Sequence, residues 1–345
     1  LSIEFDEGTN ILYGDNAQGK TNILEAIYLS GTTKSHRSSV DKEMIKFLND
    51  ESHVRVNILK HDISYRIDMH LKKSRPKGIA INGVPIRKAG DLFGILNLVF
   101  FSPEDLNIIK DGPAQRRRFL NMELCQLNKI YFNKLAAYNK ILKERNTLLK
   151  EIPYNKNLID TLDVWDEQLI DYGTYIIEER RKFIEKLNVI ISKIHANLSG
   201  NKEHLEVIYE PDTDIEFYKN KIIKNRESDI FKKTTGAGPH KDDMIFKIGD
   251  VDIRKYGSQG QQRTSALSLK LAEIQLVKDV INDTPILLLD DVLSELDSNR
   301  QNYLLNSIHD IQTVISCTGL DEFVKNRFKI NKIFKVVEGK VISEN

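Results

Sequence analysis

Apolar and polar residues alternate through much of the first hundred positions, a pattern that indicates half-buried β-strands. Strand-like segments lie at 54–59, 63–71, 79–86 and 96–101. The third of these contains Asn82-Gly83, a dipeptide typical of a tight β-hairpin. A short apolar strand at 10–13 precedes residues 20–29, whose apolar positions have helical spacing. The opening part of the chain is therefore predicted to combine strands with a helix.

The pattern changes after Pro103. From about 104 to 233 strand signals nearly vanish, and apolar residues recur at alternating intervals of four and three in two stretches, 131–149 and 158–176. Pro153 lies between these stretches, where it would end the first helix and turn the chain. We expect either an antiparallel helical hairpin with arms of about 30 Å or two helices of a compact helical subdomain.

The composition is that of a globular chain of 345 residues, with 40% hydrophobic and 29% charged residues. This length suits two domains, or one domain that carries an insertion. No apolar run approaches the roughly 20 residues of a membrane span, and no signal-peptide pattern opens the chain. We therefore expect a cytoplasmic protein that is not associated with a membrane.

The balance of charges and the two cysteines argue against nucleic-acid binding by bulk charge and against a disulfide or zinc framework. With 51 basic and 50 acidic residues, the bulk charge does not recruit nucleic acid, so any such binding must be local or conditional. The two cysteines, Cys125 and Cys317, lack the spacing of a disulfide framework or a zinc site, and we expect buried free thiols.

The junction between the first strand and the first helix carries a nucleotide-binding motif. Its residues match G-x-x-x-x-G-K-T and are Gly14, Asp15, Asn16, Ala17, Gln18, Gly19, Lys20 and Thr21. The glycines let successive backbone N–H groups point at phosphates, Lys20 neutralises the β- and γ-phosphates, and Thr21 ligates Mg²⁺. Leu1 rather than Met opens the chain close to this motif, and we expect that a first strand is missing.

A second motif supplies carboxylates. The apolar run 287–289 ends in Asp290-Asp291, and Asp290 is expected to hold Mg²⁺ directly or through water. Together with the phosphate loop, the pair predicts an ATP and Mg²⁺ site whose catalytic residues are Lys20, Asp290 and Asp291.

A third motif opens the helix predicted at 260–280. Ser258, Gly260 and Gln261 place a hydroxyl and free backbone N–H groups at the helix N-terminus, where they suit the γ-phosphate of a nucleotide held by a second copy of the chain. The same residues also make a good helix cap, and the sequence leaves both interpretations open.

This order of motifs resembles the ABC-type ATPases of the SMC-like branch, and most closely the RecF family of recombination mediators. The resemblance extends through nearly the whole chain, and it is carried by the segments 101–106, 112–120, 238–243, 258–263 and 294–297. It implies an α/β fold, an ABC/SMC-like P-loop ATPase head formed by 1–103 and 234–345. The mainly helical lobe 104–233, with its antiparallel hairpin, is inserted between the two parts of the head.

The resemblance also implies a function. Members of this family form dimers with ATP, bind single- and double-stranded DNA at gaps and junctions, and act with RecR and RecO partners to load the recombinase in DNA repair. An ABC-type motor subunit of a membrane or other multiprotein complex, not acting on DNA, is the alternative. The long helical section and the Ser-Gln-Gly-Gln-Gln signature argue against it.

Several positions depart from the pattern of ABC-type ATPases. Asp291 stands where many relatives have a glutamate that orients water, and its shorter side chain predicts a weak, slow ATPase. A histidine expected after the next strand is absent, which leaves Ser316 or Thr318 as the γ-phosphate sensor. Ser102 to Glu104 occupies roughly the place of the metal-side glutamine.

Basic residues outside the nucleotide motifs are candidates for DNA contact: Lys34, Arg37, Lys72, Lys73 and Arg75. Lysines in turns are commonly only solvated, so this signal is weak. Among Arg116, Arg117 and Arg118 we expect at least one to pair with nearby acids. His240 is expected to be a structural hinge residue rather than a metal ligand with Asp242 and Asp243.

Overall fold

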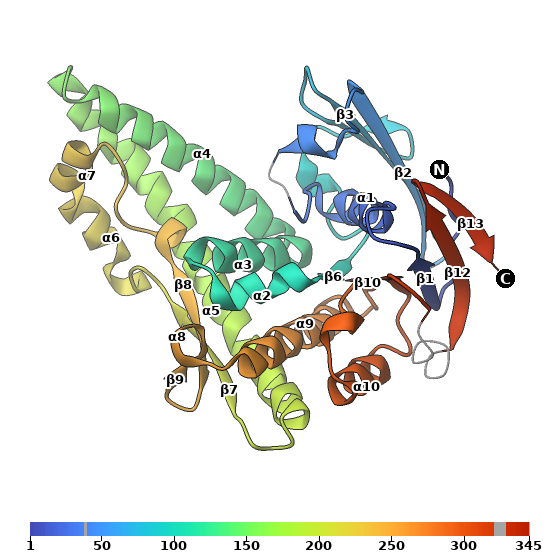
Figure 1. Ribbon diagram of the computed structural model, residues 1–345. Helices are drawn as coiled ribbons and strands as arrows, with labels where there is room; N and C mark the ends of the chain where they lie inside the picture. Colours follow the sequence, from blue (N-terminus) through green and yellow to red (C-terminus); the bar gives the residue numbers. More distant parts are fainter. Residues whose placement is uncertain (38–39, 321–328, 345) are drawn as a thin grey trace. The chain divides into compact units, whose positions relative to one another are not determined.

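The computed structural model describes residues 1–37, 40–320 and 329–344 (Figure 1). Two compact units make up the chain. The first unit contains Leu1–Asp105 and Leu267–Asn345, and the second contains Leu106–Ala266. The first unit is thus assembled from the two ends of the sequence.

A six-stranded sheet is the framework of the first unit, with the strand order β13-β12-β1-β11-β10-β6. Its strands are β1 (Thr9–Tyr13), β6 (Leu98–Phe101), β10 (Ile286–Asp290), β11 (Thr313–Cys317), β12 (Ile330–Val337) and β13 (Lys340–Glu344). All neighbouring strands are parallel except β13, which pairs antiparallel with β12. Ser316 is in register with both Leu12 and Asp290, so the carboxyl ends of β1, β11 and β10 meet at one edge.

A second, antiparallel sheet in this unit has the order β2-β3-β4-β5. Its strands are β2 (Glu51–Lys60), β3 (Ile63–Lys72), β4 (Gly78–Ile81) and β5 (Val84–Pro85). The turn between β4 and β5 is the predicted Asn82-Gly83, in which both residues have positive φ.

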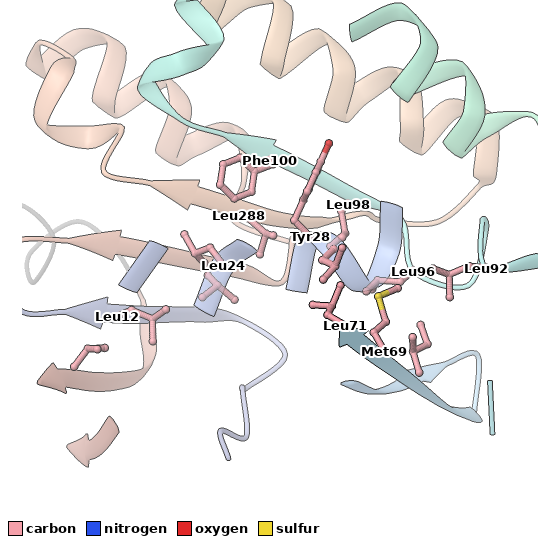
Figure 2. Close-up of a cluster of buried hydrophobic side chains, with 14 of the residues drawn as sticks. Leu12, Leu24, Tyr28, Met69, Leu71, Leu92, Leu96, Leu98, Phe100 and Leu288 are labelled. Atoms are coloured by element: carbon pink, nitrogen blue, oxygen red, sulfur yellow. The ribbon is translucent and has the colours of Figure 1, made fainter. Parts of the chain in front are cut away.

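Helix α1 (Lys20–Thr32) shares one apolar core with both sheets. Figure 2 shows Leu24 and Tyr28 of α1 in one buried cluster with Leu98 and Phe100 of β6 and with Met69 of β3. Because α1 is packed on both sides, the start of this helix and the loop before it have a fixed position at the sheet edge. Helix α10 (Ser298–Ser307) follows β10 in the same unit.

The second unit is mainly helical. Its helices are α2 (Leu106–Lys110), α3 (Pro113–Leu127), α4 (Lys129–Glu151), α5 (Leu162–Leu198), α6 (Ile215–Lys224), α7 (Arg226–Lys232) and α8 (Ile253–Tyr256). A three-stranded sheet, β7 (Leu205–Glu210), β8 (Asp243–Ile248) and β9 (Val251–Asp252), completes it. Helix α9 (Gln259–Ile281) begins in the second unit and continues in the first.

Helices α4 and α5 form an antiparallel hairpin, one of the two arrangements that the sequence pattern left open, and Figure 1 shows them side by side. Arg180 of α5 donates to the Tyr131 hydroxyl near the start of α4, and Arg145 near the end of α4 pairs with Asp166 near the start of α5. Residues of increasing number in one helix therefore face residues of decreasing number in the other, as an antiparallel pair requires.

Two features differ from the expectation. Strand β7 lies in the stretch that was predicted to be helical, and 234–266 belongs to the second unit rather than to the head. Both differences have one cause, because β7 pairs along its whole length with β8 and thereby joins 243–248 to the helical unit. Backbone pairing over such a sequence distance leaves no local signal. Within the described ranges, no helix combines the length and apolar character needed to cross a membrane.

Candidate functional site: a phosphate loop beside an acidic strand end

The loop that follows β1 has a backbone shape that favours glycine. Gly14 has φ 150°, and a Cβ atom there would lie 2.4 Å from the carbonyl oxygen of Val336 in β12. Gly19 and Ala17 also have positive φ, at 101° and 62°. Because L-residues rarely adopt these angles, the motif glycines are needed to turn the chain back over the start of α1.

Lys20 begins α1, and its side chain is only 7% exposed. The ammonium group donates hydrogen bonds to the carbonyl oxygens of Gly14 at 2.6 Å and Asp15 at 2.8 Å. A cation held beneath the loop and the N-terminal N–H groups of α1 give this concavity a positive potential. The arrangement suits a polyphosphate.

Gln18 anchors the phosphate loop to the β12–β13 turn, a role that the motif itself does not indicate. Its side-chain oxygen accepts from the N–H of Glu338 at 2.6 Å, and its carbonyl accepts from the N–H of Gly339 at 3.0 Å. The loop is therefore fastened to the turn between β12 and β13, within the same unit.

Asp290 ends β10 and is 5% exposed. Its Oδ1 atom accepts from the Thr21 hydroxyl at 3.0 Å and from the Ser316 hydroxyl at 2.6 Å. Its Oδ2 atom faces the guanidinium of Arg37 at 4.0 Å, which is beyond hydrogen-bond distance. The strand register brings Asp290 and Ser316 together, and α1 brings Thr21, so the side chains that suit Mg²⁺ converge at one point.

Asp291 follows immediately and has a left-handed backbone, with φ 56°. Its N–H donates to the carbonyl oxygen of Ser316 at 3.2 Å and to the hydroxyl of the same residue at 3.1 Å. Burial raises the pKa of the Asp291 carboxyl, and the neighbouring Asp290 charge adds to this rise while Lys20 opposes it.

These groups line a single pocket of the first unit. The lining residues are Asn16, Ala17, Gln18, Gly19, Lys20, Thr21, Asn22, Arg37, Asp290, Asp291 and Ser316. The predicted loop residues from Asn16 to Thr21 thus line the pocket together with both acidic residues, whereas Gly14 and Asp15 are not part of the lining. Of the two sensor candidates, Ser316 lines the pocket, whereas Thr318 is an exposed residue outside this lining.

The structure adds Arg37 to this pocket, although the sequence indicated it as a DNA contact. Its side chain is 48% exposed, and it follows α1 in a segment with no recognisable motif. Arg37 lies five residues after the end of α1, and no pattern in the sequence indicates that this segment reaches the pocket. Ser102, by contrast, is buried at the end of β6, where its hydroxyl lies 3.1 Å from His36 Nε2.

Ser258 and Gln261 form a reciprocal capping box at the start of α9, within the second unit. The Ser258 hydroxyl accepts from the N–H of Gln261 at 3.2 Å, and the Gln261 side-chain oxygen accepts from the N–H of Ser258 at 2.9 Å. The Gln261 amide nitrogen also donates to Glu203 at 2.9 Å. Gly260 is exposed, and a Cβ atom there would meet only the Ser258 hydroxyl, at 3.8 Å.

The remaining DNA candidates lie in the first unit. Lys34 and Arg75 are exposed, and Lys73 is half-buried. Lys72 is paired with Glu51, which neutralises its charge.

The family segment 238–243 is a structural junction of the second unit. Arg116 pairs through two nitrogens with Asp243, Arg180 pairs with Asp242, and His240 Nδ1 lies 2.7 Å from the Tyr138 hydroxyl. Burial lowers the pKa of His240, so the neutral imidazole is favoured. In the described part of the chain no cluster of acidic, histidine and cysteine side chains has the geometry of a metal site.

The fold and the pocket define a P-loop ATPase head of the SMC type. The family model for the RecF/RecN/SMC N terminal domain matches residues 1–341. The Smc head domain of Pyrococcus furiosus, with a TM-score of 0.56 and 16% identity over 99% of this chain and 92% of that one, shares the fold.

Closer relatives identify the branch. "DNA replication and repair protein RecF" of Lachnospira eligens is 62% identical over 100% of this chain and 96% of its own length. The protein of that name in Agathobacter rectalis is 64% identical over 99% of this chain and 94% of its own length. A solved structure of "the recombination mediator protein RecF-ATP in RecFOR pathway" has a TM-score of 0.91 and 37% identity, covering 99% of this chain and 93% of that one. The chain therefore belongs to the RecF family of DNA replication and repair proteins.

Proposed function

We propose that this chain is an ATP-dependent DNA-binding ATPase that acts in recombinational repair at gaps and junctions between double- and single-stranded DNA. The observation that carries the proposal is the pocket in which Thr21 and Ser316 both donate to Asp290, beside the buried Lys20. The RecF relatives and the RecF-ATP structure support the same function.

ATP and Mg²⁺ fit the residues that are present. The positive-φ glycines leave backbone N–H groups free to face phosphates, Lys20 neutralises their charge, and Thr21 and Asp290 supply oxygen ligands for the metal. Mg²⁺ held by Thr21 and Asp290 would neutralise phosphate charge. Ser316 keeps Asp290 oriented through its hydrogen bond to Oδ1.

Asp291 is the residue that would orient the attacking water. Aspartate is one methylene shorter than the glutamate of many ABC-type ATPases, and its carboxyl is partly buried with a raised pKa. The shorter side chain holds the carboxylate back from the water, so turnover is slow, below about 1 s⁻¹. ATP hydrolysis then serves as a switch rather than as a source of rapid turnover.

We propose that the start of α9 serves ATP-dependent dimerisation. The Ser258 cap and the exposed N-terminus of α9 suit the γ-phosphate of ATP held by another copy, so ATP joins two chains. The exposed Gly260 supports this role, because a Cβ atom there would meet only the Ser258 hydroxyl, at 3.8 Å, among the residues that the structure describes. A homodimer doubles the number of phosphate contacts available to DNA, and affinity rises steeply with their number.

We further propose RecR- and RecO-type partners and a cytoplasmic location, in keeping with the RecFOR pathway named for the solved RecF structures. Recombinase loading at gaps is the process that these partners would serve.

Binding of labelled gapped DNA, with and without ATP and Mg²⁺, tests the proposal. Wild type should bind gapped DNA much more tightly with ATP, and Lys20→Met should lose this difference. Equal binding by wild type with and without ATP would contradict an ATP-dependent DNA function. Lys186→Met, an exposed lysine of the second unit outside the pocket lining and outside the candidate DNA contacts, is the control for the loss of one positive charge.

A further inference from the structure

The turn before β2 exposes two large apolar side chains next to each other. The N–H of Asn49 donates to the carbonyl of Lys46 at 3.1 Å, which makes Phe47 and Leu48 the central residues of a β-turn. Phe47 is 94% exposed and Leu48 is 100% exposed. Turns ordinarily have polar residues or glycine at their central positions, so two exposed apolar side chains there are unusual.

Leu48 is also conformationally unfavourable. Its φ is 70°, the value that the third residue of a type II turn requires and that glycine or asparagine adopts at least cost. A leucine here has backbone strain and gains no burial in return, so neither local conformation nor packing explains the residue. Strain of this kind is found where a side chain has a task outside the fold.

The turn is held firmly in place despite its exposure. Ile45, just before it, is 6% exposed in the core that surrounds α1, and Met44 packs against the same core. On the other side, the N–H of Lys73 donates to the carbonyl of Asp50 at 3.0 Å. The two apolar side chains therefore project from a rigid base.

That base is positively charged. Glu51 and Lys72 are register partners at the end of the β2–β3 hairpin, so the turn and the segment 73–77 lie at the same end of the sheet. Four cations lie in or next to these two segments and form no ion pair within the described ranges. They are Lys42, Lys46, Lys73 and Arg75. The acids of the same region are Asp41, Glu43, Asp50 and Glu51, of which Asp41 and Glu51 pair with Lys77 and Lys72. Six lysines and arginines against these four acids leave an excess of positive charge.

We infer that the turn Lys46–Asn49 is a wedge for DNA: Phe47 and Leu48 stack on the end of the base-pair stack at a double-strand/single-strand junction, while Lys46, Lys73 and Arg75 hold the adjacent phosphates. Apolar side chains that enter a base step must unstack it, at a cost of a few kcal/mol. A junction already exposes the face of its last base pair, so this cost is smallest there. The wedge rests on the proposed DNA function and gives it a source of junction preference.

Fluorescence of 2-aminopurine at the last base pair of a gapped duplex tests the wedge, with full-length protein, ATP and Mg²⁺. Wild type should change this fluorescence, and Phe47→Ala and Leu48→Gly should each abolish the change and weaken junction binding by about tenfold. Leu48→Gly relieves the positive-φ strain, so loss of binding in this variant cannot be ascribed to misfolding. Phe231→Ala removes an 86% exposed phenylalanine of the second unit and should leave both signals unchanged.

Salt dependence separates the two parts of the wedge. Lys46→Gln and Lys73→Gln should each reduce the slope of log affinity against log salt by about 1, whereas Phe47→Ala should leave the slope unchanged. If wild type binds the junction and both Phe47→Ala and Leu48→Gly bind it with the same affinity, the wedge is overturned. Loss of binding to phosphatidylserine vesicles in these variants, with DNA binding unchanged, would assign the turn to a membrane surface and would also overturn it. Failure of wild type to bind any DNA with ATP would instead contradict the proposed function.

Discussion

Asp290 of the first unit and Asp242 of the second unit are both buried aspartates that face an arginine, yet their oxygens are used differently. Asp242 Oδ1 accepts from the N–H of Asp212, and Oδ2 accepts from Arg180 and from the Tyr209 hydroxyl. In Asp290, only Oδ1 accepts hydrogen bonds from hydroxyl groups, those of Thr21 and Ser316, and Oδ2 lies 4.0 Å from the Arg37 guanidinium. A fully hydrogen-bonded buried carboxylate stabilises the fold, whereas one with an oxygen directed into a pocket can bind a metal.

The largest effect should come from breaking the closed network of the second unit. Arg180→Met leaves Asp242 buried without its cation and should lower the free energy of unfolding by about 3–5 kcal/mol, measured by urea denaturation. Arg181→Met is the matched control, because Arg181 pairs at the surface with Asp214 and should cost at most about 1 kcal/mol. An equal decrease in the free energy of unfolding for the two variants would show that the buried pair contributes no more to stability than the surface pair.

A substitution at the open carboxylate should act on catalysis instead. Asp290→Asn retains an oxygen that can accept from Thr21 and Ser316, so the fold should survive, but the charge that suits Mg²⁺ is lost. ATPase turnover should fall on the order of 100-fold, with little change in the urea midpoint. An unfolding loss as large as that of Arg180→Met would remove the contrast between the two aspartates.

The pH dependence of turnover reports on Asp291. Its pKa is raised above the ordinary value of 3.8, mainly by burial, so the carboxylate becomes protonated at a higher pH than a free aspartate does. Because the ionised form orients water, activity should fall as pH drops through this raised pKa. Asp291→Asn should lower turnover and remove the acidic limb of the profile. An unaltered limb in this variant would assign the titration to another group.

The smallest expected effect is an increase in the free energy of unfolding. Gly260→Ala replaces a glycine in the first turn of α9 at a position where a Cβ atom meets nothing closer than 3.8 Å. The variant should be more stable by about 0.5–1 kcal/mol, measured by thermal unfolding. If a γ-phosphate approaches this helix end, the same methyl group should weaken ATP-dependent dimerisation. A variant that is stabilised and dimerises normally would show that Gly260 serves no contact outside its own chain.

How much the sequence reveals differs between these two regions. The phosphate loop is eight consecutive residues with a fixed backbone shape, and Asp290 ends an apolar run, so both could be identified without coordinates. The strands of the head and the α4–α5 hairpin also followed from periodicity. These features depend on residues that are close in sequence, and the alternation or spacing is visible directly.

Features that depend on distant pairing could not be predicted. The sequence does not predict strand β7, because its register partners in β8 lie 33 to 43 positions further along, from Glu210–Asp243 to Leu205–Ile248. This pairing also moves 234–266 out of the predicted head. Arg145 and Arg180 are ordinary helix residues in the sequence, and only the packing of α4 against α5 shows that they are buried. Arg37 likewise reaches the pocket through the fold of α1 rather than through a motif.

In the proposed dimer, ATP joins two copies through the phosphate loop of one and the Ser258 cap of the other. Sedimentation velocity of wild type and Ser258→Arg, each with ATP and Mg²⁺ and with nucleotide binding measured in parallel, tests this most directly. We predict that wild type forms a dimer with ATP, and that Ser258→Arg binds ATP normally but remains a monomer. A Ser258→Arg protein that dimerises with ATP as wild type does would contradict the shared site.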